Sequence, residues 1–353
     1  MELEETSILR KEVAKLAGVS EATVSRVLNG VGPVREETRR RVLEAAQRLD
    51  YVPSALAQRF ARRKSGNLGV ILPLLPKVNV FSTHYFSEIL SGIGVAAKRR
   101  GYDLLLLLRE PEEQKDYVGL FRAQKIDACI VLGAHDTPGE REALEELRLG
   151  RHPFCLVNQR FDHAPYSTID ADQRMGVEAA VGHLLQQGCR RIMLLGGPEA
   201  YSNSLDRLEG YRSALADAGI PFDPELVLNG NYSRTSGYAL AEAVANHVCA
   251  GRVDAVIAAN DRMAIGLLQG LKERGVSVPG QVALIGCDDS EGARLTDPPL
   301  SSIAVPFVDI GREAASRLLD QLEQTDREEE GLPCFQDKLP VRLVPRGSSS
   351  MQH

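Results

Sequence analysis

The 353-residue chain contains no tryptophan, and aromatic residues make up only 5% of it. It has no run of 18 apolar residues, which excludes a membrane-spanning helix. Residues 1–5 are mainly acidic and carry no hydrophobic stretch, so we expect no secretory signal and a cytoplasmic location. The six cysteines form no CxxC pair and most lie in or beside apolar runs, so we expect reduced thiols and no metal site.

The sequence also lacks the short motifs of several enzyme classes. No GxxxxGK(S/T), GxSxG or HExxH occurs, and the seven histidines show no metal-ligand spacing. An enzyme would have to depend on carboxylates such as Asp288 and Asp289, and no nucleophile accompanies them in the sequence. We therefore expect neither catalysis nor a cofactor.

The net charge of −6 is unevenly distributed along the chain. Residues 1–65 hold 13 Lys and Arg against 9 Asp and Glu, a net charge of +4, whereas the remainder has a net charge of −10. A basic segment on an acidic body indicates that nucleic acid binds at one end of the protein only.

The first fifty residues show the apolar spacing of three short helices, at 11–17, 21–28 and 36–49. Gly18 allows a turn after the first helix, Ser20 is expected to cap the second, and Gly30 is expected to end it. Two helices joined by such a turn form a helix-turn-helix. A further short helix is expected at 55–61, before the basic linker that ends at Ser65.

After this linker, short apolar runs alternate with amphipathic helices, the pattern of parallel sheets covered by helices on both faces. The chain is long enough for two or three domains, and two halves divide near residues 167–172. The predicted strands lie at 68–72, 104–108, 128–132, 154–157, 192–195, 255–258 and 282–285.

These patterns predict four segments. Residues 1–53 form a small all-α helix-turn-helix domain, and 54–65 form a short helix and linker, called the hinge helix and linker below. Residues 66–346 form an α/β domain of two lobes, each a doubly wound parallel sheet, and 347–353 form a disordered tail. The predicted N-lobe holds about 66–168 plus 303–331, and the predicted C-lobe about 169–302 plus 332–346.

The motif at 13–29, VAKLAGVSEATVSRVLN, resembles the helix-turn-helix signature of the LacI/GalR family of bacterial transcription regulators. The resemblance continues at Tyr51-Val52-Pro53, and segments of the body follow in the family's order at 68–73, 191–197, 207–211, 259–261 and 285–289. It implies a periplasmic-binding-protein-like body, a homodimer, a palindromic DNA operator and a small-molecule effector.

The sequence departs from the family's pattern at the start of the first helix. Leu9 stands where the family has a capping Thr, so we expect Thr6 or Ser7 to cap a longer first helix.

The resemblance also implies which residues contact DNA. The second helix of a helix-turn-helix enters the major groove, so Glu21, Ala22 and Arg26 are expected at base edges, with Arg26 paired to guanine. The hinge helix is expected in the minor groove, where Phe60 replaces the wedging Leu of the family. The remaining expected DNA contacts are Ser20, Thr23, Ser25 and Asn29 at phosphates, and Ala57 in the hinge.

A ligand in such a body lies between the lobes, at the carboxyl ends of the strands. The resemblance implies that Arg207 donates a forked pair of hydrogen bonds to it and that Tyr232 stacks on it. Asp261 is expected to cap the helix that follows it. The full set of expected effector contacts is Tyr85, Phe86, Asn158, Arg207, Tyr232, Asn260 and Asp288. A sugar or sugar derivative is the expected effector.

Other hypotheses stay open on the sequence. A purine or nucleoside could act as corepressor, because Tyr232 and Arg207 can hold a base as well as a sugar. A sugar-binding protein or enzyme without DNA-linked regulation would have no use for residues 1–65. The sequence does not distinguish an inducer from a corepressor.

Overall fold

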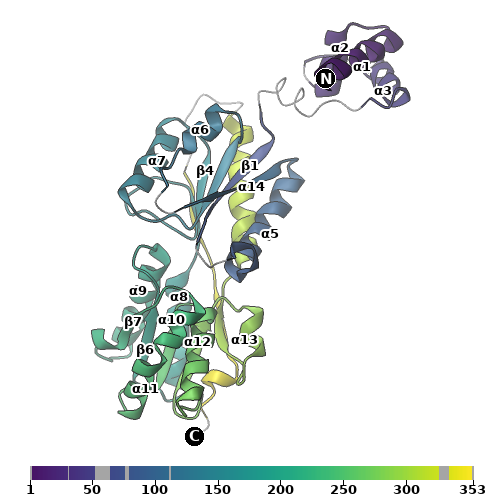
Figure 1. The fold of residues 1–353 in the computed structure, drawn as a ribbon. Helices are drawn as coiled ribbons and strands as arrows, with labels where there is room; N and C mark the ends of the chain where they lie inside the picture. Colours follow the sequence, from purple (N-terminus) through teal and green to yellow (C-terminus); the bar gives the residue numbers. More distant parts are fainter. Residues whose placement is uncertain are drawn as a thin grey trace.

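The computed structural model describes residues 2–30, 32–51, 64–75, 79–110, 113–325 and 334–351, with side chains from residue 10 onward. A small helical unit precedes two stacked α/β lobes, the N-lobe and the C-lobe (Figure 1). No helix in these residues is long and apolar enough to cross a membrane.

The helical unit consists of α1 (Glu2–Ala17), α2 (Glu21–Asn29) and α3 (Glu36–Arg48). Ser20 caps α2 through its side chain, and Gly30 ends it in the left-handed conformation at φ 66°, as the sequence predicts. The three helices enclose a small apolar core formed by Val13, Ala14, Ala17, Val24, Val27, Val42, Ala45 and Ala46.

The first helix is longer than the sequence predicts. It begins at Glu2, so Thr6 and Ser7 lie inside it, and the prediction that one of them caps its start is wrong. The predicted hinge helix at 55–61, with Ala57 and Phe60, lies outside the described residues.

The N-lobe is built on a six-stranded sheet of order β11-β5-β4-β3-β1-β2. All of its strand pairs are parallel. Its strands are β1 (Asn67–Pro73), β2 (Asp103–Arg109), β3 (Ala128–Leu132), β4 (Phe154–Val157), β5 (Thr168–Ala171) and β11 (Gln336–Leu339). Its helices are α5 (His84–Arg99), α6 (Tyr117–Arg122), α7 (Pro138–Leu149) and α14 (Phe307–Thr325). A short turn of 3-10 helix, η1 (Val80–Ser82), precedes α5.

The C-lobe has a second six-stranded sheet of order β12-β10-β9-β8-β6-β7, in which only the β10–β12 pair is antiparallel. Its strands are β6 (Ile192–Gly196), β7 (Val227–Asn229), β8 (Ala255–Ala258), β9 (Ala283–Cys287), β10 (Ser301–Ala304) and β12 (Arg342–Val344). Its helices are α8 (Gln173–Gln186), α9 (Ser202–Asp217), α10 (Arg234–Ala239), α11 (Ala241–Cys249), α12 (Asp261–Glu273) and α13 (Glu291–Leu295). Two turns of 3-10 helix, η2 (Pro224–Leu226) and η3 (Gly347–Ser349), complete it.

The chain crosses between the lobes three times, after β5, β10 and β11, and these crossings correct the predicted lobe boundaries. β10 pairs with β9, so residues 303–304 belong to the C-lobe sheet rather than to the N-lobe. β11 pairs with β5, so residues 336–339 belong to the N-lobe rather than to the C-lobe. β5 pairs with β4, so residues 169–171 belong to the N-lobe rather than to the C-lobe. Apolar runs in the sequence predict where the strands are. They do not predict which lobe a strand belongs to, because the two lobes contain similar sheets.

The predicted disordered tail is also wrong for residues 347–351. The side chains of Ser348 and Ser349 are fully buried. Ser348 Oγ donates to the carbonyl of Leu284 at 2.6 Å and accepts from the N–H of Ser301 at 2.8 Å. This segment therefore joins β9 to β10 through hydrogen bonds that its polar sequence does not reveal.

Candidate functional site

Of the three residues of α2 predicted to read DNA bases, two are exposed and one is half-buried. The side chains of Ala22 and Arg26 are exposed. Glu21 is half-buried, and its carboxylate lies 3.8 Å from Nε of Arg10 on α1. Arg26 is therefore the exposed cation of this helix, whereas Glu21 also ties α2 to α1.

The residues predicted to contact phosphates are partly engaged within α2. Ser20 Oγ accepts from the N–H of Thr23 at 3.2 Å and lies 2.9 Å from Thr23 Oγ1. Asn29 is buried at 8% exposure, and its Nδ2 donates to Ser25 Oγ at 3.0 Å. The positive end of the α2 dipole, at Ser20, is the part of the helix best suited to a phosphate.

A polar cluster surrounds Arg207 on α9, at the face of the C-lobe that meets the N-lobe. Arg207 is 5% exposed, and its Nη1 donates to the hydroxyl of Tyr232 at 3.2 Å. That hydroxyl donates to Asn203 Oδ1 at 2.7 Å and also contacts Ser204 Oγ. The guanidinium lies 5.9 Å from the centre of the Tyr232 ring and reaches Cys287 Sγ with Nη2. The two predicted contacts Arg207 and Tyr232 thus lie together.

Asp288 follows β9 next to this cluster, with its backbone at φ 112°. Burial and the nearby Asp261 raise the pKa of the Asp288 carboxyl well above its ordinary value, and the charge of Arg207 opposes that shift. Asp288 thus lies close enough to Arg207 for their charges to interact.

Asn260 has a structural role that its prediction as an effector contact does not include. It is the N-cap of α12, where its Oδ1 accepts from the N–H of Met263 at 2.9 Å. Its Nδ2 donates to the carbonyl of Tyr232 at 3.1 Å. The prediction that Asp261 caps α12 is wrong, because Asp261 instead accepts from the Ser302 hydroxyl at 2.6 Å.

Tyr85 and Asn158 of the N-lobe lie beside the C-lobe residues of the Arg207 cluster, and this meeting region of the two lobes is called the cleft below. Burial raises the pKa of Tyr85, and Asn158, Tyr201 and Tyr232 lie close enough to change it further. Asn158 follows β4 in the left-handed conformation at φ 57°, and Asn203 Nδ2 of the C-lobe donates to its carbonyl at 3.2 Å. These contacts show that the two lobes meet around the Arg207 cluster.

Phe86 differs from Tyr85 in its surroundings. It is 7% exposed, belongs to the apolar core of the N-lobe, and contacts the Tyr85 ring edge-on at 4.8 Å between centroids. Phe86 therefore supports Tyr85 by packing.

Three buried side chains near this cleft retain polar atoms without a hydrogen-bond partner within the described part of the chain. These atoms are Nε of Arg207, Nε2 of Gln173 and both carboxylate oxygens of Asp170. A buried polar group left without a partner costs about 1–3 kcal/mol, so such groups favour a polar ligand or water at the site. Burial is the main reason that the pKa of Asp170 is raised to about 6.

Sequence reasoning missed Asp170 and Gln173 as possible ligand contacts, and it also missed His135 and Tyr201. His135 follows β3 by three residues and contacts the Tyr201 hydroxyl of the C-lobe. A polar side chain shortly after a buried strand is the signal that identified Asn158, and the same signal applies to His135.

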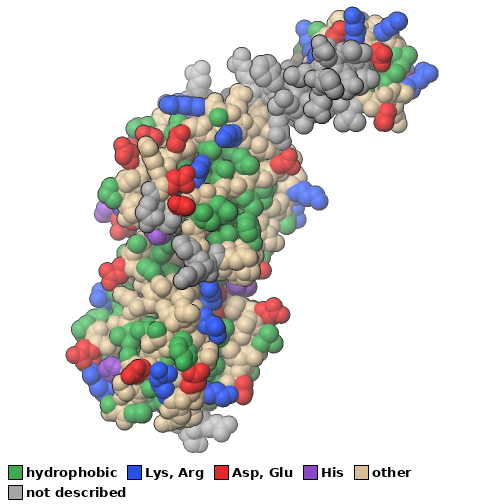
Figure 2. Space-filling view, viewed as in Figure 1, with side chains coloured by type: hydrophobic (Ala, Val, Ile, Leu, Met, Phe, Trp, Pro, Cys, Tyr) green, Lys and Arg blue, Asp and Glu red, His purple; other side chains and the backbone are tan. Residues whose placement is uncertain are grey.

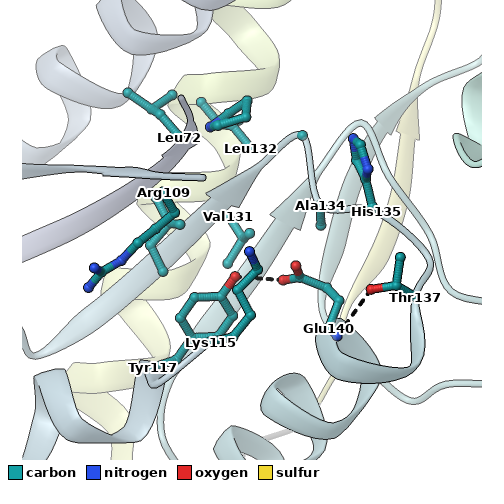
Figure 3. Close-up of a pocket in the computed structure, with 13 residues that line it drawn as sticks. Leu72, Arg109, Lys115, Tyr117, Val131, Leu132, Ala134, His135, Thr137 and Glu140 are labelled. Atoms are coloured by element: carbon teal, nitrogen blue, oxygen red, sulfur yellow. Dashed lines mark hydrogen bonds between the residues drawn. The ribbon is translucent and has the colours of Figure 1, made fainter. Parts of the chain in front are cut away.

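A pocket of the N-lobe opens beside the cleft, at the carboxyl ends of β1 and β3, where the strand order reverses (Figure 3). Inside it, the Tyr117 hydroxyl donates to Glu140 Oε1 at 2.6 Å. Burial raises the pKa of Glu140 more than Tyr117 and Lys115 lower it. His135 lines this pocket and also contacts Tyr201 of the C-lobe, so the pocket adjoins the interface between the two lobes.

No group of His, Cys, Asp and Glu side chains in the described segments could hold a metal ion.

Comparisons with known proteins agree with this organisation. Residues 11–54 match a family described as bacterial regulatory proteins, lacI family, and residues 181–349 match a periplasmic binding protein-like domain. The chain is 34% identical over 318 residues to the HTH-type transcriptional regulator AscG of Escherichia coli, covering 89% of this chain and 92% of AscG. It is 32% identical to the regulator CelR of Thermobifida fusca over 94% of both chains.

Solved structures show the same likeness. The lac repressor dimer bound to operator and the anti-inducer ONPF has a TM-score of 0.77 at 29% identity, covering 96% of this chain and 98% of that chain. A complex of the regulator CelR with cellobiose has a TM-score of 0.70 at 30% identity, covering 96% and 99%. The chain belongs to the LacI family of bacterial regulatory proteins and is a DNA-binding transcription regulator rather than an enzyme.

Proposed function

We propose that this regulator is a repressor that binds a two-fold-symmetric operator as a homodimer and responds to a sugar held between its lobes. The observation that carries the proposal is the buried polar cluster around Arg207, in one chain with the exposed Arg26 on a helix-turn-helix. Such a protein acts on chromosomal operators in the bacterial cytoplasm.

Recognition of the operator depends on α2. Its amino-terminal end enters the major groove in proteins of this type, and an exposed Arg can bind guanine with two hydrogen bonds. One helix-turn-helix contacts only a half-site, so tight binding needs two copies related by symmetry.

The N-lobe has a face suited to such a dimer. β2 is the edge strand of its sheet, and Leu106 and Leu108 on this strand are 39% and 40% exposed. Val95 on α5 is 45% exposed. Hydrophobic side chains gather on the surface of the N-lobe, whereas charges of both signs are spread over the rest of the view (Figure 2). Exposed apolar surface of this kind favours association with a second subunit.

The cleft residues are suited to carbohydrate. Arg207, Asp288 and Asn158 offer charged and amide groups to hydroxyls, and Tyr232 offers an aromatic face. A complex of the similar regulator CelR contains cellobiose, which supports a sugar as the effector.

A purine or nucleoside is the second candidate effector. Similar proteins include the repressors CytR of Escherichia coli and PurR of Vibrio atlanticus, and the stacked Arg207 and Tyr232 could hold a base. Thermal unfolding with cellobiose, other sugars, nucleosides and purines separates the two. A ligand at 100 times its Kd adds about 2.7 kcal/mol to stability. Stabilisation by purines and by no sugar would contradict the sugar proposal.

Operator binding is tested by selecting sites from random DNA and measuring affinity by fluorescence anisotropy. We expect a palindromic site and, for Arg26→Ala, a loss of about 1–3 kcal/mol with relaxed preference at one base pair of each half-site. Arg40→Ala, at an exposed position of α3 outside the reading helix, is the matched control. Equal losses in both variants would contradict the role of α2.

A further inference from the structure

The first turns of α9 are held to the N-lobe by a set of contacts separate from those of the Arg207 cluster. The N–H of Ser202 donates to Gln159 Oε1 at 2.9 Å, and the N–H of Arg160 donates to Ser202 Oγ at 2.8 Å. The Tyr201 ring lies edge-on to His135, with 4.9 Å between centroids. The beginning of this helix is therefore part of the junction between the lobes.

Asp206 is the charged centre of that junction. Arg160 donates two hydrogen bonds to its carboxylate, from Nη1 to Oδ2 at 2.7 Å and from Nη2 to Oδ1 at 2.9 Å. Lys338 Nζ lies 3.2 Å from the same Oδ2. Asp206 lies on α9 of the C-lobe, whereas Arg160 follows β4 and Lys338 lies on β11, both in the N-lobe.

Asp206 and Arg160 are poorly exposed, which strengthens their interaction, whereas the Lys338 side chain is 40% exposed. The Asp206 side chain is 15% exposed and that of Arg160 is 27% exposed. Burial alone would raise the pKa of Asp206, but Arg160 and Lys338 together hold it below its ordinary value, so the carboxylate is charged. A bidentate arginine–carboxylate pair fixes orientation as well as distance.

Asp206 is also next to Arg207, which the proposed function assigns to the effector site. Arg207 follows it on the same helix and contacts Tyr232 and Cys287 of the C-lobe. Because α9 is a continuous helix, a ligand that moves the backbone at Arg207 must also move Asp206. The bidentate pair favours one distance and orientation, so a movement of Asp206 favours a matching movement of Arg160 and the N-lobe.

We propose that Asp206 is the positioning residue that sets the angle between the lobes, and that its ion pairs with Arg160 and Lys338 transmit effector binding at Arg207 to the N-lobe. The transmission part rests on the proposed function, whereas the setting of the angle does not. A ligand changes DNA affinity only by binding two lobe arrangements unequally, and Asp206 contributes that difference by stabilising one of them.

The lobe angle is measured in the full-length protein without effector or DNA. Spin labels are attached at Glu142→Cys on α7 and Lys272→Cys on α12, both exposed, after the exposed Cys249 and Cys334 are changed to Ser. Excess unlabelled protein keeps most label pairs within one subunit. We expect Asp206→Asn to broaden the interlobe distance distribution about twofold. Asp217→Asn, at an exposed position near the other end of α9, is the matched control and should leave it unchanged.

Three outcomes decide the proposal. An Asp206→Asn distribution equal to that of Asp217→Asn overturns it. Broadening in Asp206→Asn that Asp206→Glu reverses supports a role of the carboxylate rather than of packing. If Asp206→Asn does not fold, Lys338→Gln is measured instead. The proposal then requires the interlobe distance distribution of Lys338→Gln to be broader than that of the unaltered protein.

Transmission is measured as the ratio of operator Kd values with and without cellobiose. We expect Asp206→Asn to reduce this ratio about tenfold, and Asp217→Asn to keep it. If Asp206→Asn has the same ratio of operator Kd values as the unaltered protein, Asp206 does not transmit effector binding. If cellobiose leaves the operator affinity of the unaltered protein unchanged, cellobiose fails as the effector, and the distance measurement still decides the role of Asp206.

Discussion

Gly92, in the middle of α5, lies against the backbone of α14. A Cβ at this position would lie 2.0 Å from the carbonyl oxygen of Val308 and 2.8 Å from the backbone N of Arg312. The contact is reciprocal, since a Cβ at Gly311 would lie 2.1 Å from the carbonyl oxygen of Ile89. Two glycines facing each other's helix therefore allow α5 and α14 to approach closely.

We expect Gly92→Ala to destabilise the N-lobe. The new methyl group would overlap backbone rather than a movable side chain, so the helices must separate by roughly 1 Å, and overpacking of this kind costs about 1–3 kcal/mol or more. Alanine's better helix propensity returns about 1 kcal/mol. These two effects alone leave a loss of about 0–2 kcal/mol. Separating the helices also opens space along the rest of their contact, which raises the expected loss to about 1–3 kcal/mol.

Gly94 in the same helix provides the control. A Cβ there would lie 3.7 Å from Leu104 Cδ1, an ordinary contact, so Gly94→Ala should stabilise by up to about 1 kcal/mol through helix propensity. Urea unfolding followed by circular dichroism measures both variants. Equal stabilities for Gly92→Ala and Gly94→Ala would refute the close-approach reasoning.

Two further predictions concern the cap of α2 and the buried carboxyl of the cleft. Ser20→Ala should destabilise the helical unit by about 1 kcal/mol through loss of the N-cap, measured by thermal unfolding, whereas Ser20→Asp should retain the cap. Asp170 has a folded-state pKa raised to about 6, so the stability linked to its proton is present below about pH 4 and is lost as the pH rises through 6. Asp170→Asn should therefore be about 2–3 kcal/mol more stable than the unaltered chain at pH 7 and show little difference at pH 4; a difference independent of pH would contradict this assignment.

The helix-turn-helix and most strands could be predicted from the sequence because their signals are local. Ser20 and Gly30 mark the ends of α2 by side-chain capping and positive φ, and the run at 128–132 is a strand whichever neighbours it pairs with. The partners of β10 and β11 could not be predicted in this way. Their choice of sheet depends on contacts with strands distant in the sequence, β9 for β10 and β5 for β11.

The site was predictable to a similar degree. The position of polar residues after strands predicts Asn158, Asp288 and Asn260 as ligand contacts. The sequence does not show that the Asn260 side chain caps α12. Asp170 carries no sequence signal that separates it from a surface carboxylate, because its burial arises only when β5 lies between β4 and β11. The bidentate pair of Arg160 and Asp206 joins residues 46 positions apart and likewise appears only in the folded protein.

The late strands β11 and β12 have a consequence for biosynthesis. Residues 336–344 add one strand to each lobe, so neither sheet is complete until they have left the ribosome. The helical unit, in contrast, is complete by residue 51. At about 5–20 residues per second, the roughly 300 intervening residues take about 15–60 s to synthesise. During this interval the nascent chain carries a finished DNA-reading helix without a finished sensor or a partner subunit, and a single helix-turn-helix binds DNA too weakly to repress. The order of strands along the chain thus makes the two sheets of the body the last parts of the protein to be completed.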